Sequence, residues 1–161
     1  MSKEKKRAIR ILGRVLFVIY MAVLFYLLLV SEGYGRGEFA GQAYRYNLEP
    51  FREIRRFWIH REKVGYLASF LNIGGNVIGF MPFGFFLPVM HRRLKHVWLV
   101  TLLGFLTSLF AETFQLLFKV GCFDVDDLML NTAGAAAGYL LFLICDVIRR
   151  LKFESELSKL P

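Results

Sequence analysis

The chain has 161 residues, about the length of one domain, and 56% of them are hydrophobic, with 17 phenylalanines. This composition is too apolar for a soluble domain that must cover itself with polar surface, so it indicates a polytopic membrane protein. The net charge of +8 argues little for nucleic-acid binding, because the basic residues lie at the ends of apolar runs and form no single basic face.

The first predicted element is a transmembrane helix from Ile11 to Val30, which follows a basic leader. Arg14 lies close enough to the start of this run for its side chain to reach the membrane surface. The alternative is a cleaved signal peptide. However, the run is long for one and no A-x-A-like cleavage site follows it, so we expect a retained first span.

Residues 31–63 form the long polar connection, which opens with a Gly-rich stretch expected to be irregular. Apolar side chains then recur at helical spacing: Phe51, Ile54, Phe57 and Trp58. With Pro50 in its first turn, this pattern predicts a short amphipathic helix in the membrane interface. Its arginines either meet lipid phosphates or reach a bound anionic ligand, and the candidates for the second role are Arg52, Arg55 and Arg56.

A second apolar segment runs from Val64 to Met90, and its prolines predict a kink or break in its second half. Four polar or small residues share one face of its first half: Asn72, Gly75, Asn76 and Gly79. The two glycines form a GxxxG pair, which predicts close approach of another helix there. The two asparagines either only join helices or take part in a site.

The third helix is predicted from Val97 to Phe118 and the fourth from Leu128 to Val147. One stripe of the third holds its polar and small residues: Thr101, Gly104, Ser108, Glu112 and Gln115. Asn131 shares a face of the fourth with a second GxxxG pair, Gly134 and Gly138. The charged tail after the fourth helix is expected to fray.

Basic residues in the short connections gather in the leader, in the turn 91–96 and in the tail, which places these three in the cytoplasm. With that orientation, polar residues of three helices meet at one depth near the outer surface: Asn72, Asn76, Glu112, Gln115 and Asn131. The acidic loop with Asp124, Asp126 and Asp127 lies beside them. The sequence therefore predicts a polar pocket that faces the extracytoplasmic side.

Several roles remain open for these groups. They either bind the head group of a ligand, or Glu112 and Asp126 act as acid and base in an enzyme. A further alternative is that these carboxylates hold a hard divalent cation with oxygen ligands. The D-x-D-D spacing lacks the Gly and distal Glu of a calcium loop, so no metal site is assigned, and no cofactor is identified. The structural alternative for the aspartates is an N-cap and first-turn charge for the fourth helix.

Four stretches resemble the sequence blocks of the VanZ-like membrane proteins: NLEPFREI, NIGGNVIGFMPFGFFLP, AETFQ and FDVDDLMLNTAGAAAGY. The resemblance covers roughly residues 15–148. The matching positions are Asn72, Asn76, Phe80, Pro82, Gly84, Glu112, Gln115, Asp124, Asp126, Asp127, Asn131 and Gly134. It implies a small protein of the bacterial cell membrane, in a family whose founding member is associated with resistance to lipidated glycopeptides such as teicoplanin.

We therefore expect an all-α, multi-pass membrane protein with four transmembrane helices and a short interfacial helix. Residues 1–148 would form one VanZ-like domain and residues 149–161 a charged cytoplasmic tail. The expected function is binding of a lipid-linked cell-wall precursor or a lipoglycopeptide at the outer pocket, among membrane lipids as partners. The alternative is an envelope-lipid hydrolase or transferase, and the oligomeric state stays open.

Overall fold

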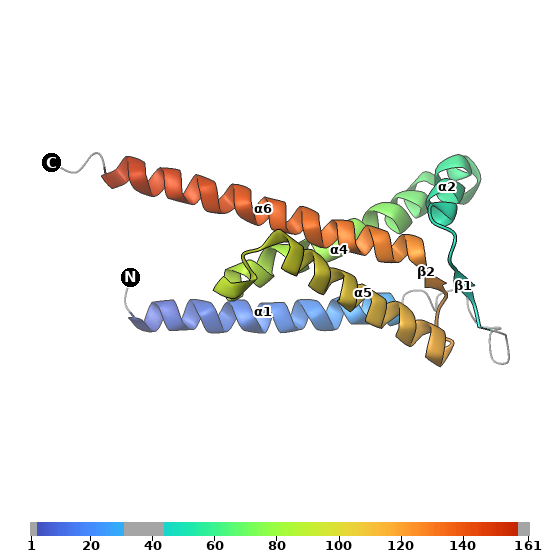
Figure 1. The fold of residues 1–161 in the computed structure, drawn as a ribbon, viewed down its shortest axis with the longest axis horizontal. Helices are drawn as coiled ribbons and strands as arrows, with labels where there is room; N and C mark the ends of the chain where they lie inside the picture. Colours follow the sequence, from blue (N-terminus) through green and yellow to red (C-terminus); the bar gives the residue numbers. More distant parts are fainter. Residues whose placement is uncertain (1–2, 31–43, 158–161) are drawn as a thin grey trace.

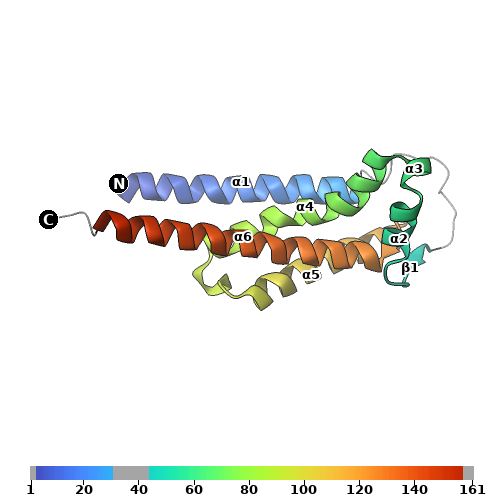
Figure 2. The same cartoon turned by 90° about the horizontal axis from the view of Figure 1, so that it is seen from above.

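The computed structural model describes residues 3–30 and 44–157. Four of its helices are long and apolar enough to cross a membrane, as predicted. Helix α1 starts and helix α6 ends at the same end of the bundle, while the short strands and α2 lie at the opposite end (Figures 1 and 2). Which end faces the cytoplasm stays a prediction from the distribution of basic residues.

Helix α1 (Lys3–Val30) lies along one side of the bundle and buries little of its surface. Its anchor is Tyr20, whose hydroxyl donates a hydrogen bond of 2.6 Å to the carbonyl oxygen of Gly79. Leu24 is its one buried hydrophobic side chain among the described residues. Most of this helix is therefore available to lipid, which its apolar composition permits.

The amphipathic helix is present as α2 (Arg52–Ile59), followed by the single turn α3 (Arg61–Val64). No residue of α2 is buried, as expected for a helix that lies at the surface of the bundle. Pro50 stands two residues before the helix begins, so it belongs to the preceding turn and not to the first helical turn as predicted. The Gly-rich stretch 31–43 lies outside the described residues.

Helix α4 (Tyr66–Met90) is continuous through Pro82 and Pro88, so of the two predicted outcomes the break does not occur, and the kink stays a prediction. Transmembrane helices tolerate proline because neighbouring helices and local adjustments satisfy the freed carbonyl groups. The helix ends where the backbone N–H of His91 donates to the carbonyl oxygen of Leu87, before the short 3-10 turn η2 (Arg92–Leu94).

Helix α5 (Val97–Phe118) has the bounds predicted from the sequence. Helix α6 (Val125–Leu157) is longer than predicted, so the expected fraying of the charged tail is wrong as far as Leu157. Arginine, lysine, glutamate and leucine all favour the helix, so this charged segment continues it readily. Ion pairs between Asp146 and the arginines of the next turn support the extension.

Glycines set the contact between α4 and α6, the most extensive in the bundle. A Cβ atom added to Gly138 would come within 1.9 Å of the Met81 carbonyl oxygen, and one added to Gly134 within 2.3 Å of that of Val77. The predicted close approach at this GxxxG pair is therefore confirmed.

The other GxxxG pair, Gly75 and Gly79 of α4, does not bring the backbone of another helix close, as it was predicted to do. A Cβ atom on Gly75 would meet nothing within 4 Å, and one on Gly79 would make only an ordinary contact with Leu24. The close approach on α4 occurs instead at Gly84, where a Cβ atom would lie 1.9 Å from the Ala135 carbonyl oxygen. The α4–α6 crossing is centred further along α4 than the sequence pattern indicated.

Two short strands close the far end of the bundle. Strand β1 (Tyr46–Asn47) pairs in parallel with β2 (Phe123–Asp124), which lies between α5 and α6. The pairing puts Asn47 opposite Asp124 and so fixes the polar connection onto the acidic loop. This ladder positions the polar residues described next.

Candidate functional site

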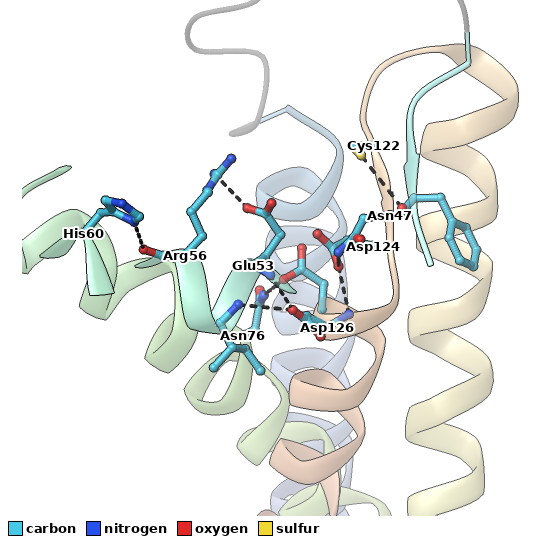
Figure 3. A network of polar contacts seen from close by, with 11 residues as sticks. Asn47, Glu53, Arg56, His60, Asn76, Cys122, Asp124 and Asp126 are labelled. Atoms are coloured by element: carbon cyan, nitrogen blue, oxygen red, sulfur yellow. Dashed lines mark hydrogen bonds and ion pairs between the residues drawn. The ribbon is translucent and has the colours of Figure 1, made fainter. Parts of the chain in front are cut away.

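The candidate site lies at the end of the bundle where the two strands, the start of α2 and the start of α6 meet (Figure 3). Several polar side chains are buried here even though the surrounding helices are apolar: Asn47, Ser108, Glu112, Gln115, Asp124, Asp126 and Asn131. Buried polar groups are costly unless they are hydrogen-bonded, so their partners decide what they do.

Asp126 caps helix α2. Its two carboxylate oxygens accept hydrogen bonds from the backbone N–H groups of Phe51 at 2.5 Å, Glu53 at 2.8 Å and Ile54 at 3.1 Å. The first amides of a helix have no partner within it, and α2 has no side-chain cap of its own. Phe51 adopts a left-handed backbone conformation at the cap position, with φ of 65°. A carboxylate from another helix thus replaces the missing local cap and meets the positive end of the helix dipole.

Asp124 joins three elements. One of its oxygens accepts the backbone N–H of Asp126 at 2.8 Å, which is the predicted N-cap of the fourth helix. The same oxygen accepts the Asn47 side-chain amide at 3.0 Å, while the backbone N–H of Asp124 donates to Glu112 at 2.9 Å. The N-cap prediction is confirmed for Asp124, whereas Asp126 caps a different helix.

The side chains of the transmembrane helices meet at this end, as the spacing predicted. Asn76 of α4 donates to Asp127 of α6 at 2.5 Å, and Asn131 of α6 donates to Ser108 of α5 at 2.9 Å. Gln115 of α5 donates to the backbone carbonyl of Leu28 in α1 at 2.6 Å. These bonds tie α1, α4, α5 and α6 together. With the bonds of Asp124 and Asp126 they form what is here called the polar network. Ligand binding by the same groups stays a prediction.

Two further sequence candidates have looser surroundings. Asn72 is half-buried one turn from Asn76, and none of the network's hydrogen bonds within the described part of the chain involves it. Arg55 is exposed on α2. The proposed catalytic pair, Glu112 and Asp126, is almost wholly buried, with 1% of each residue exposed, so a substrate would reach it only after local opening.

Next to the network lies an open hollow of about 550 Å³, here called the arginine hollow. It is lined by Tyr44, Arg45, Tyr46, Asn47, Arg52, Glu53, Arg56 and Cys122. Arg56 pairs with Glu53 at 2.7 Å, whereas Arg52 reaches its nearest carboxylate, that of Glu49, only at 4.0 Å. The lining holds three guanidinium groups and one carboxylate, so basic side chains outnumber acidic ones on the wall of the hollow, while the carboxylates of Asp124 and Asp126 lie near Glu53 outside that wall.

Sequence reasoning identified Arg52 and Arg56 but missed Arg45, Asn47 and Glu53. Asn47 has a local signal. Its side-chain oxygen accepts the backbone N–H of Glu49 at 3.2 Å, which is an Asx turn, a common role of Asn before a turn. Asn47 and Glu53 also lie in the stretch NLEPFREI, which was compared with the family without a role being given to either residue. Arg45 lies before that stretch, and it is placed by the strand pairing that directly follows it.

Burial shifts the pKa of two carboxylates beside the arginine hollow. It raises the pKa of Glu53 above its ordinary value of 4.5, and the nearby Arg56 guanidinium only partly offsets this effect. Burial also raises the pKa of Asp124 against the hydrogen bonds from the Asp126 amide and from Asn47. Both folded carboxylates therefore bind a proton more readily than in the unfolded chain.

This shift predicts a pH effect on stability. Where the native state binds more protons than the unfolded one, the free energy of unfolding falls as pH rises. For Glu53 this fall begins at about pH 4 and ends above its raised pKa. Glu53→Gln removes the ionisable group, so its melting temperature relative to the wild type is expected to rise between pH 4 and pH 7. Thermal unfolding in detergent measures this difference, with the exposed Glu62→Gln as the control. A relative decrease over the same range would mean that the Arg56 pair outweighs burial.

Metal binding receives no support from the described residues, among which no three His, Cys, Asp or Glu side chains are placed to hold an ion. The carboxylates of the acidic loop instead accept hydrogen bonds from amides.

Comparisons with known proteins agree with the architecture. The VanZ/LLP1 family profile matches residues 17–146. Protein VanZ of Enterococcus faecium is 30% identical over 138 residues, which cover 83% of this chain and 74% of that protein. No solved structure matches. The family match includes two of the four apolar helices in full and most of the other two, together with the polar network between them, and the chain belongs to the VanZ/LLP1 family of membrane proteins.

Proposed function

We propose that this protein binds a lipid-linked cell-wall precursor or a lipoglycopeptide through an anionic head group held in the arginine hollow. The hollow would face the extracytoplasmic side of the cell membrane. In this role the protein acts in the cell envelope and is linked to resistance to glycopeptides such as teicoplanin. The observation that carries the proposal is the grouping of Arg45, Arg52 and Arg56 around one open hollow at the end of a membrane-spanning bundle.

The chemistry of the hollow favours a phosphate-bearing or carboxylate-bearing group. A guanidinium donates two parallel hydrogen bonds to either oxyanion, which an ammonium group does not do. Arg52 and Arg56 keep 62% and 57% of their side chains exposed, so their donors are available to a ligand. Tyr44 and Tyr46 add aromatic surface for the sugar or apolar part of such a ligand.

The polar network beneath the hollow would position these arginines. Arg52 and Arg56 both belong to α2, and α2 is held by the carboxylate of Asp126. Asp124 in turn holds Asn47 on the opposite wall. Under this proposal Glu112, Asp124 and Asp126 act by supporting the hollow, while the arginines contact the ligand.

The test is binding by the purified protein in detergent of an undecaprenyl-pyrophosphate-linked precursor, of teicoplanin and of vancomycin, which lacks an acyl chain. Arg52→Gln combined with Arg56→Gln is expected to weaken binding of the preferred ligand by about tenfold or more, because two charge-assisted contacts are lost. Expression of the same variants in cells would lower teicoplanin resistance relative to the wild type.

Arg55→Gln is the matched control for the single variants Arg52→Gln and Arg56→Gln, because each removes one charge from the same helix, but Arg55 lies outside the lining of the hollow. An equal loss for Arg55→Gln and for either single lining variant would indicate a general attraction to charge and contradict a defined site. Preference for teicoplanin over the precursor would identify the lipoglycopeptide as the ligand. Failure of all three ligands to bind would overturn the proposal.

A further inference from the structure

A second hollow lies at the other end of the bundle, between α4, α6 and the segment that leads into α5. Its volume is about 340 Å³, and its lining combines apolar and charged side chains: Phe85, Pro88, Val89, Lys95, Phe142, Cys145, Asp146 and Arg149. It is far from the arginine hollow, whose walls come from β1, α2 and the α5–α6 loop. The family assignment and the proposed function leave this second hollow without a role.

Asp146 fixes the positive groups on one side of the second hollow. It is 9% exposed and pairs with Arg149 through one oxygen and with Arg150 at 2.7 Å through the other. The two arginine side chains remain 74% and 66% exposed. One carboxylate thus orders two guanidinium groups without covering them, and one positive charge is left over on this side.

A third cation comes from a distant part of the sequence. The Lys95 ammonium lies over the ring of Phe142 at 5.5 Å from its centroid, a cation–π contact that keeps it on the wall of the hollow. Lys95 follows η2, whereas Arg149 belongs to α6, so the fold brings two separate basic segments to one place. The Asp146 carboxylate attracts Lys95 as well as the two arginines, but one carboxylate against three basic groups leaves a net positive charge that a bound anion would offset.

The apolar part of the lining decides which anion fits. Phe85 and Val89 belong to the second membrane span and Phe142 to the fourth, so the hollow opens beside the membrane-facing surface of the bundle. Val89 is 57% exposed, which leaves room for a hydrocarbon chain against it. A free phosphate ion would gain nothing from these walls, whereas a phospholipid uses both the cations and the apolar surface.

We propose that the second hollow binds an anionic phospholipid of the adjoining leaflet, with its phosphate between Lys95 and Arg149 and its acyl chain along Phe85 and Val89. The chemical class is a phosphatidylglycerol-type lipid, which carries a net negative charge. Basic hollows between transmembrane helices at the membrane surface recognise such head groups. The bound lipid joins α4 to α6 at the end of the bundle that the polar network does not reach.

Cys145 provides a direct probe, because it lines the hollow and its thiol is free and exposed. The full chain in a nonionic detergent is treated with a maleimide, and labelling of Cys145 is followed by mass spectrometry. Added phosphatidylglycerol is expected to slow this labelling, while phosphatidylcholine and glycerol phosphate are not. Native mass spectrometry of the same samples should retain phosphatidylglycerol on the protein.

Lys95→Gln combined with Arg149→Gln should raise the phosphatidylglycerol concentration for half-protection by about 25-fold, since each basic residue near an anionic lipid contributes about fivefold. Arg93→Gln combined with Lys152→Gln removes the same charge from exposed neighbours outside the lining and should leave protection unchanged. Equal protection by phosphatidylcholine, protection by glycerol phosphate alone, or equal loss in both double variants would each overturn the proposal. Absence of any protection in the wild type would do so as well.

Discussion

Replacing Gly138 by alanine is expected to destabilise the protein by about 3 kcal/mol or more, because the new methyl group has no space. The Cβ atom would lie 1.9 Å from the carbonyl oxygen of Met81, and this atom belongs to the backbone of α4, which cannot rotate away. Gly84→Ala meets the Ala135 carbonyl oxygen at the same distance and should behave alike. Thermal unfolding in detergent and the yield of monodisperse protein measure the effect.

Gly75→Ala is the matched control on α4, the helix that also holds Gly84. A methyl group there meets nothing within 4 Å, and alanine favours a helix over glycine by about 1 kcal/mol, so this variant should be unchanged or slightly more stable. A stable Gly138→Ala protein would mean that α4 and α6 are further apart than the structure has them. A strongly destabilised Gly75→Ala protein would indicate a contact with another chain or with a lipid at that face.

Replacing Asp126 by alanine is expected to release the start of α2. Three backbone N–H groups lose their acceptor, which should cost about 2–4 kcal/mol, the range of a lost helix cap together with unsatisfied amides. Hydrogen exchange of the segment 51–59 should become faster, and binding at the arginine hollow should weaken because Arg52 and Arg56 lie on this helix. Exchange measured by mass spectrometry on the purified protein tests the first effect directly.

Glu49→Ala removes a carboxylate from the same end of the bundle, but that side chain is 73% exposed and should affect neither exchange nor stability noticeably. If Asp126→Ala abolished ligand binding while the exchange of α2 stayed as in the wild type, Asp126 would contact the ligand directly. The cap would then be a minor role of this residue.

The sequence was sufficient for the membrane architecture, because the hydrophobic effect acts on continuous apolar runs that can be read locally. The bounds of α5 follow from the polar residues at its two ends, and the N-cap at Asp124 follows from an aspartate directly before a helical pattern. Helical spacing also predicted that polar groups of α4, α5 and α6 would meet at one end, where Asn76 reaches Asp127 and Asn131 reaches Ser108.

Other features depend on contacts between distant segments. Asp126 and the amide of Glu53 are 73 positions apart, and nothing in the local pattern of either says that one caps the other. Likewise, two GxxxG pairs look equivalent in the sequence, yet only Gly134 and Gly138 meet a backbone closely. The crossing point of two helices depends on how all their side chains pack, which a spacing rule does not contain.

The sequence by itself thus determined that the chain spans the membrane four times and which polar side chains face inward, since both follow from local hydrophobicity and helical period. Only the tertiary structure decided which of those side chains bond to one another and which arginines border an open hollow. Hydrogen-bond partners and cavities depend on distances of a few ångströms between segments that folding brings together.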